Sequence, residues 1–196
     1  MPAAEPERVH CETVEAWRAW LDAQGDRTEG VWLISWKKVS GKPAMTYDES
    51  VRHALCFGWV DSKTGSLDEE RSMVWFAPRR RGSGWARTNK VRVEELLAEG
   101  LMTPRGQAVI DAAKADGTWT MLDDVENLVI PKDLAAAFRA HPGSRKQFDG
   151  FPRSVKRGIL EWIVQAKKPE TRAKRIAETA EKAQRDERAN QWSPKA

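Results

Sequence analysis

Cysteine, tyrosine and histidine are scarce in this chain, and their scarcity excludes several classes of protein. The two cysteines, Cys11 and Cys56, are too few for a disulfide framework, so we expect a reducing compartment. The sequence contains neither an HExxH motif nor a CxxC pair, so we expect no metal site and no cofactor. Long apolar runs and an apolar signal-peptide core are also missing, which predicts a cytoplasmic protein without a membrane span.

Acidic residues are missing from one long segment. Residues 71–92 contain seven lysines and arginines and no aspartate or glutamate, and residues 153–175 contain eight against two. The net charge of the whole chain is only +4, so the positive charge is concentrated rather than spread. Concentrated basic segments favour an anionic partner.

Tryptophan is abundant, with ten residues against a single tyrosine. Each indole buries a large area, so we expect most of them to lie in the core. Trp32, Ile34 and Trp36 alternate within residues 30–38, and one shared apolar face there favours core packing over a nucleic-acid platform. The tryptophans are Trp17, Trp20, Trp32, Trp36, Trp59, Trp75, Trp85, Trp119, Trp162 and Trp192.

The pattern of apolar residues predicts an α+β fold. Short β-branched and aromatic runs predict a small antiparallel sheet of about three strands, at residues 30–38, 59–61 and 73–77. Helical spacing predicts flanking helices and an all-helical C-terminal half. We divide the chain into an α+β region, 1–120, and a helical region, 121–196, and expect the two to pack as one domain.

The stretch from Thr46 to Gly58 predicts a short capped helix. Thr46 and Glu49 have the spacing of a capping box, and Gly58 suits the helix end. Cys56 then falls near the C-terminal end, where the helix dipole disfavours a thiolate. We therefore interpret Cys56 and His53 as structural residues rather than as a nucleophile with its base.

Three long strings resemble the YdeI/OmpD-associated family of bacterial proteins, also described as bacteriocin-protection proteins. They begin "TYDESVRHALCFGWVDS", "FAPRRRGSGWARTNK" and "PKDLAAAFRAHPGSRKQFDGF". The resemblance runs from about Val31 to Thr179, and Leu55 to Asn89 is its most specific part. It implies a role in stress and antimicrobial-peptide resistance, and it brings no reaction and no catalytic residues.

The basic loop "PRRRGSGWARTNK" is the strongest candidate for a ligand site. Glycines free its backbone, a helix begins within it, and arginines supply bidentate donors, which together suit a small anion or a phosphate. We therefore predict a protein that binds an anionic ligand through residues 78–89, with a simple solvated basic loop as the alternative. The predicted ligand-binding residues are Arg79, Arg80, Arg81, Ser83, Trp85, Asn89 and Asp61.

Asp61 keeps three interpretations open. Strand alternation places it on the same face as Trp59. If it reaches the arginines, it forms a structural ion pair or contacts the ligand, and otherwise it is simply exposed. In the alternative function, an enzyme acts on a small anionic substrate, with Asp61 as acid/base and Ser83 or Cys56 as a remote nucleophile candidate. Weak nucleic-acid binding is the third hypothesis.

The second basic run predicts a helix that starts at Pro169. Its cations suit either simple solvation or contact with nucleic acid or anionic lipid headgroups. The sequence leaves the oligomeric state open. The residues of this run are Lys167, Lys168, Arg172, Lys174 and Arg175.

Overall fold

A computed structural model describes residues 5–191, which form two compact units. The first unit comprises residues 5–83 and 88–117, and the second comprises residues 84–87 and 118–191. The expectation that the two regions pack as one domain stays a prediction. Trp192 and the tail that follows it lie outside the described residues.

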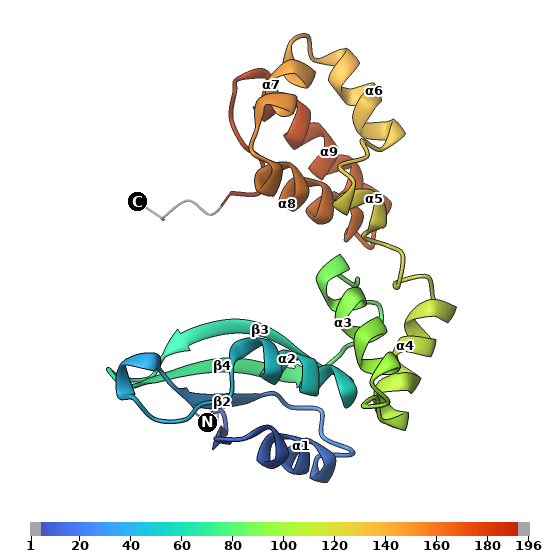
Figure 1. The fold of residues 1–196 in the computed structure, drawn as a ribbon. Helices are drawn as coiled ribbons and strands as arrows, with labels where there is room; N and C mark the ends of the chain where they lie inside the picture. Colours follow the sequence, from blue (N-terminus) through green and yellow to red (C-terminus); the bar gives the residue numbers. More distant parts are fainter. Residues whose placement is uncertain (1–4, 192–196) are drawn as a thin grey trace. The chain divides into compact units, whose positions relative to one another are not determined.

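The first unit contains a four-stranded sheet in the order β1-β2-β4-β3 (Figure 1). The β2–β4 and β4–β3 pairs are antiparallel, while β1 pairs parallel with β2. The predicted α+β class is confirmed, with one strand more than expected. The additional strand, β1, has three residues, too few to show an alternating pattern in the sequence. The strands are β1 (Arg8–His10), β2 (Val31–Trp36), β3 (Trp59–Ser66) and β4 (Arg71–Pro78).

The β3–β4 hairpin is longer than the sequence predicts because its turn is closed by a side chain. One Asp68 oxygen accepts hydrogen bonds from the backbone N–H groups of Glu70 and Arg71, and the other accepts from the Arg71 guanidinium at 2.7 Å. These bonds satisfy backbone N–H groups of the turn, so both strands continue up to it. A shift in register between Asp61 and Lys63 then interrupts the β3–β4 pairing.

The helix that the sequence predicts after Thr46 is confirmed. The Thr46 hydroxyl accepts from the Glu49 N–H, and the Glu49 carboxylate accepts from the Thr46 N–H, which completes the capping box. The chain leaves the helix through Gly58, at a φ of 76° that favours glycine. The helices between residues 14 and 115 are α1 (Val14–Ala23), η1 (Lys38–Ser40), α2 (Tyr47–Cys56), α3 (Arg87–Ala98) and α4 (Pro104–Ala115).

One face of the sheet is the core of the first unit. Val31, Leu33 and Phe76 are at most 1% exposed on this face. Trp17 of α1 packs on Phe76 with ring centroids 5.3 Å apart and donates to the Ser50 carbonyl of α2 at 3.1 Å, so both helices cover the same face.

The opposite face carries tryptophans that the sequence analysis assigned to the core. Trp32 pairs across the sheet with Trp75, and both are only half-buried, as is Trp36. Ile34, between them, is 7% exposed and buried as expected. The expectation was therefore wrong for Trp32 and Trp36, because the helices cover only the other face of the strand. Of the nine described tryptophans, Trp17, Trp59 and Trp85 are fully buried, and the other six are half-buried.

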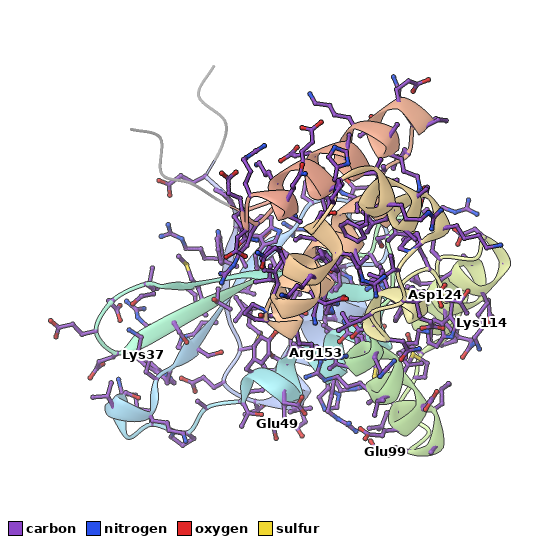
Figure 2. All side chains as sticks on the ribbon, turned by 90° about the horizontal axis from the view of Figure 1, so that it is seen from above. Lys37, Glu49, Glu99, Lys114, Asp124 and Arg153 are labelled. Atoms are coloured by element: carbon purple, nitrogen blue, oxygen red, sulfur yellow. The ribbon has the colours of Figure 1, made fainter. Side chains whose placement is uncertain are left out.

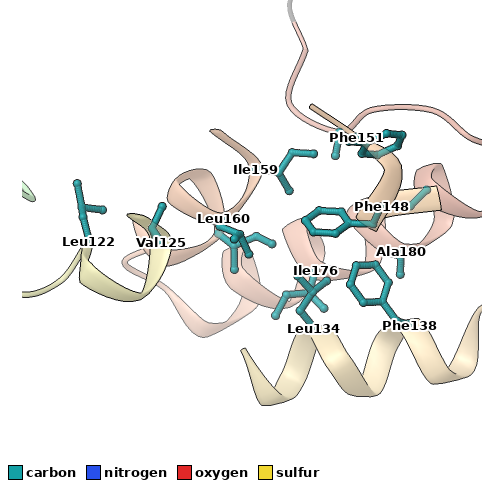
Figure 3. Close-up of a cluster of buried hydrophobic side chains, with 13 residues drawn as sticks. Leu122, Val125, Leu134, Phe138, Phe148, Phe151, Ile159, Leu160, Ile176 and Ala180 are labelled. Carbon is teal, nitrogen blue, oxygen red and sulfur yellow. The ribbon is translucent and has the colours of Figure 1, made fainter. Parts of the chain in front are cut away.

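The second unit is all-helical, as the sequence predicts. Its last helix, α9, contacts α6, α7 and α8, and it begins at Pro169 as expected. Leu134, Phe138, Phe148 and Ile176 contribute to a buried apolar cluster between these helices (Figure 3). The helices are α5 (Asp123–Glu126), α6 (Lys132–Ala140), α7 (Ser144–Gly150), α8 (Arg153–Val164) and α9 (Pro169–Gln184).

Among residues 5–191, no helix combines the length and the apolar character that crossing a bilayer requires.

Two helical glycines should respond oppositely to alanine. At Gly106 a Cβ atom would lie 2.2 Å from the Cys56 carbonyl oxygen, so we expect Gly106→Ala to destabilise the protein by about 1–3 kcal/mol. At Gly158 a Cβ meets nothing within 4 Å, so Gly158→Ala should stabilise by roughly 0.5–1 kcal/mol through helix propensity. Urea unfolding of both variants tests this. Stabilisation by Gly106→Ala would contradict the tight α2–α4 contact.

Candidate functional site

The basic loop begins as a closed turn at the end of β4, which we call the arginine turn (residues 79–83). The Arg79 N–H donates to the Gly58 carbonyl at 2.9 Å, which extends the β3–β4 pairing by one bond. The Ser83 N–H and hydroxyl both donate to the Arg80 carbonyl, at 3.3 and 2.7 Å. Gly82 takes a φ of 79°, in the left-handed region. The turn therefore has a defined backbone and projects its arginines from fixed positions.

The three arginines of the turn have different environments. Arg79 is half-buried, and this burial lowers the pKa of its guanidinium to about 10, against the opposing effect of the nearby Asp61 carboxylate. Arg80 and Arg81 are exposed, and their side chains make no hydrogen bond or ion pair within residues 5–191. Most other arginines of the first unit are neutralised, as Arg52 is by Glu95 and Glu99. Arg80 and Arg81 thus carry uncompensated charge.

A pocket of about 590 Å³ lies beside the arginine turn. Trp75, Pro78 and Arg80 form part of its wall from the β4 side, and Gly30 and Arg27 from the β2 side. Its volume lies in the range of small-molecule sites.

The charges around this pocket are partly balanced. Arg27 is bound to Glu7 at 2.6 Å, so these two wall charges neutralise each other. Glu5 and Glu29 also line the pocket, opposite in sign to Arg80. An anionic group is therefore favoured only where the ligand meets the arginine turn.

Asp61 faces α2 and accepts a hydrogen bond from the Tyr47 hydroxyl at 2.6 Å. It pairs with Phe76 of β4 and so shares the helix-covered face with Trp59, as alternation predicts. Partial burial, together with this bond to a carboxylate, raises the pKa of Tyr47 to about 12. The structure thus brings Asp61 close to Arg79 and adds Tyr47, which the sequence analysis missed because nothing local links α2 to β3.

Asn89 lies on α3 and is used within the fold. Its side-chain oxygen accepts from Arg92 at 2.9 Å, and the same guanidinium binds Asp48 of α2 at 2.7 Å. Both Arg92 and Asp48 are close enough to Tyr47 to affect its pKa. Asn89 therefore belongs to the polar cluster around Tyr47 and Asp61.

Trp85 belongs to the second unit, unlike the arginines that precede it in the loop. It is 2% exposed and packs against Trp119 with ring centroids 4.9 Å apart. Leu122 and Met121 crowd the neighbouring Gly84, where a Cβ atom would lie 2.8 Å from either side chain. A ligand role for Trp85 stays a prediction, and its indole contributes mainly to packing.

His53 and Cys56 both contact arginines of the first unit. The Cys56 thiol donates to the Arg52 carbonyl at 3.5 Å, and burial raises its pKa. His53 contacts Arg18 through Nδ1 at 3.0 Å, and burial lowers its pKa. Neutral forms of both groups are therefore favoured. Among the described residues, no group of three His, Cys, Asp or Glu side chains could hold a metal ion.

A second pocket, of about 360 Å³, lies at the N-terminal end of α2. Tyr47, Met45 and Val74 are among the residues that line it. Lys37, beyond the end of β2 (Figure 2), also lines this pocket, but it donates to the Ser66 hydroxyl and the Asp68 carbonyl, at 2.8 and 2.6 Å. Its charge is thus used to hold the β3–β4 turn.

The second basic run is partly structural. Arg172 binds Asp133 of α6 at 2.7 Å, and Arg175 donates to the Trp162 carbonyl and lies over its ring, 4.9 Å from the centroid. Lys168 and Lys174 are exposed, as is Lys167. The run therefore divides into arginines that hold α9 in place and lysines that face solvent.

Two family models match the chain. Residues 9–109, just over half of the sequence, match the family model described as "Domain of unknown function (DUF8412)". The chain belongs to this family. A second model, "Bacteriocin-protection, YdeI or OmpD-Associated", matches residues 127–186, which confirms the resemblance to that family for the second unit. Neither the curated proteins nor the solved structures contain a match.

The YdeI/OmpD-associated match covers a different part of the chain from the one expected to be most specific. Residues 55–89 were expected to be its most specific part, and they fall within the DUF8412 match instead. The YdeI/OmpD-associated match covers α6 to α9. The arginine turn, Asp61 and Tyr47 thus all lie in the DUF8412 part of the chain.

Tyr47 is the only tyrosine, so its ionisation can be followed directly. We expect the folded protein to titrate near pH 12 rather than 10, and Asp61→Asn to lower this value. Because the pKa is raised on folding, the associated stabilisation is complete below pH 10 and is lost as the pH rises toward 12. Tyrosinate absorbance and chemical denaturation across this range measure both effects. A parent protein that titrates like free tyrosine would contradict the Tyr47–Asp61 hydrogen bond.

Proposed function

We propose that this protein binds a small anionic ligand, such as a phosphorylated metabolite, at the arginine turn. The observation that carries the proposal is the pair of uncompensated guanidinium groups, Arg80 and Arg81, one of which lines a pocket of about 590 Å³. Guanidinium groups bind phosphate and carboxylate oxygens in a bidentate manner. We further propose that the protein is cytoplasmic and acts in bacterial stress or antimicrobial-peptide resistance, as the name of the second family model suggests.

Arg79 and Asp61 lie near each other at the base of the arginine turn. Asp61 lies near the half-buried Arg79, which holds one positive charge next to a negative one at the base of the turn. Arg80 and Arg81 remain available, since Ser83 and Gly82 fix the backbone without using their side chains. The pocket wall adds the apolar surface of Trp75 and Pro78. A ligand with an anionic group joined to a flat or apolar body fits this combination.

An enzyme acting on a small anionic substrate is the second candidate. The hydrogen bond between Tyr47 and Asp61, with Tyr47 in the wall of the 360 Å³ pocket, favours it. Asp61 would serve as acid or base. We rank it second because this carboxylate is already engaged by Tyr47 and lies near Arg79. Contact of Lys167, Lys168 and Lys174 with nucleic acid or anionic lipid is a further proposal for α9.

The double variant Arg80→Ala with Arg81→Ala tests the leading proposal. Thermal shift against a panel of phosphate-bearing metabolites should identify ligands that raise the melting temperature of the parent protein, because binding to the folded state stabilises it. We expect the double variant to lose this response, with its melting temperature without ligand unchanged, since both side chains are exposed. Arg79 is left intact because its guanidinium is half-buried.

Arg185→Ala with Arg188→Ala is the matched control. It removes the same formal charge from two exposed arginines of the second unit, of which Arg185 pairs with Glu187 at 3.3 Å, so it should respond to ligand as the parent does. An equal loss of response in this control would show that only net charge matters. A response that persists in the Arg80/Arg81 variant would refute the proposed site.

A further inference from the structure

The sheet face opposite α1 and α2 carries aromatic and basic side chains together, and we call it the indole face. Its central row crosses all four strands: Arg8 pairs with Trp32, Trp32 with Trp75, and Trp75 with Lys63. Trp36 lies four residues further along β2, about 13 Å from Trp32 at strand spacing. The row and Trp36 thus provide two separate aromatic positions on one surface.

The indoles of this face are accessible and adopt a defined geometry. Trp32 and Trp75 meet edge to face, with centroids 5.3 Å apart and planes at 72°. Both are half-buried, so part of each ring faces outward. Trp36 is fixed at its polar edge, where Nε1 donates to Glu12 at 2.8 Å. The rings are therefore held in place before any partner binds.

Cations border each aromatic position. The Lys63 ammonium lies 5.9 and 5.6 Å from the centroids of Trp32 and Trp75. Lys42 and Arg71 lie over Trp36, at 3.7 and 5.9 Å. Cation–π attraction of this kind orders the charged groups beside the rings.

Among the described residues, the indole face carries two unpaired cations, Arg8 and Lys63, against the carboxylate of Glu12 that the Trp36 indole contacts. Lys42 and Arg71 are balanced by acids of the β3–β4 turn, at 3.4 and 2.6 Å. Arg8 and Lys63, at the two ends of the central row, are exposed and have no ion pair within the described part of the chain. A complementary partner must therefore supply negative charge at the ends of the row and flat rings between them.

We propose that the indole face binds single-stranded nucleic acid. Bases would stack on Trp32 or Trp75, and a base that reaches Trp36 would displace the Lys42 ammonium from its ring, while Arg8 and Lys63 would contact phosphates. Stacking on aromatic side chains together with basic groups along the backbone is how proteins bind single strands without reading their sequence. A duplex holds its bases inside the stack, so it cannot offer them to these rings. The indole face shares Trp75 with the wall of the pocket beside the arginine turn, but its proposed phosphate contacts, Arg8 and Lys63, are different from Arg80 and Arg81.

The test measures fluorescence anisotropy of labelled oligo(dT) and oligo(rU), about 20 nucleotides long, with the full chain. Trp32→Leu keeps an apolar residue but removes the stacking surface, and we expect about five- to a hundredfold weaker binding. Arg8→Gln with Lys63→Gln removes two phosphate contacts, so the slope of log affinity against log salt should fall by about 1.4. Comparison of the two oligonucleotides shows whether the 2′-hydroxyl contributes.

The controls separate stacking from general attraction of anions. Trp162→Leu removes a half-buried indole of the second unit, and Arg185→Gln with Arg188→Gln removes the same charge there, so neither should weaken binding. Circular dichroism checks the fold of every variant. If Trp32→Leu does not fold, the exposed Arg8/Lys63 variant still decides the proposal.

Four results would overturn the proposal. They are no binding of either oligonucleotide, equal binding of duplex, binding of polyglutamate or an acidic peptide as tight as that of oligonucleotide, and oligonucleotide binding unchanged by both face variants. The Arg80/Arg81 variant should still bind oligonucleotide within about twofold of the parent. A failure of the arginine-turn proposal is therefore distinguishable from a failure of this one.

Discussion

The first unit depends on the alternation of side chains along β4. This strand pairs with both β2 and β3, so its register fixes which residues of three strands face the helices. Val74 and Phe76 face α1 and α2, whereas Met73 and Trp75 face the other side. A shift of one residue would exchange the two sets and place Trp75 in a core shaped for Phe76. The buried contact between Phe76 and Trp17 opposes that shift.

The same strand delivers both candidate binding surfaces of the first unit. Trp75 belongs to the indole face, and the chain that leaves β4 at Pro78 forms the arginine turn. Arg79 still bonds to Gly58 as the strands do, so its position is set by the sheet. Beyond it the backbone folds back on itself through Gly82, which frees Arg80 and Arg81 from the sheet. The transition from strand to turn thus divides one run of three arginines into one half-buried and two exposed side chains.

Local rules account for the features that the sequence predicts correctly. The capping box of α2, the start of α9 at Pro169 and the face of Asp61 depend on residues within a few positions of one another. The features that it misses depend on contacts between distant segments. The hydrogen bond from Tyr47 to Asp61 and the burial of Trp85 against Trp119 are set by packing. Trp32 shows the same limit, since alternation gives the shared face but not whether helices cover it.

Ion pairs formed within the fold explain why a dense basic segment need not be a binding surface throughout. Within residues 71–92, Arg71 pairs with Asp68 and Arg92 with Asp48, while Arg87 donates to the neutral amide of Asn127. Exposed ion pairs like the first two contribute little to stability, with a median of roughly 0–1 kcal/mol, but they do compensate the charge. What remains available is set by which carboxylates the fold brings near.

The two family matches fall largely in different units of the chain. The second unit has its own apolar core, and the YdeI/OmpD-associated match lies within it. The arginine turn up to Ser83 and the indole face lie in the first unit, in the part that matches DUF8412. A resistance phenotype suggested by one family name therefore gives no information about the chemistry of the other unit. Ligand chemistry has to be assigned from the side chains of the first unit, where the uncompensated cations Arg8, Lys63, Arg80 and Arg81 all favour anionic partners.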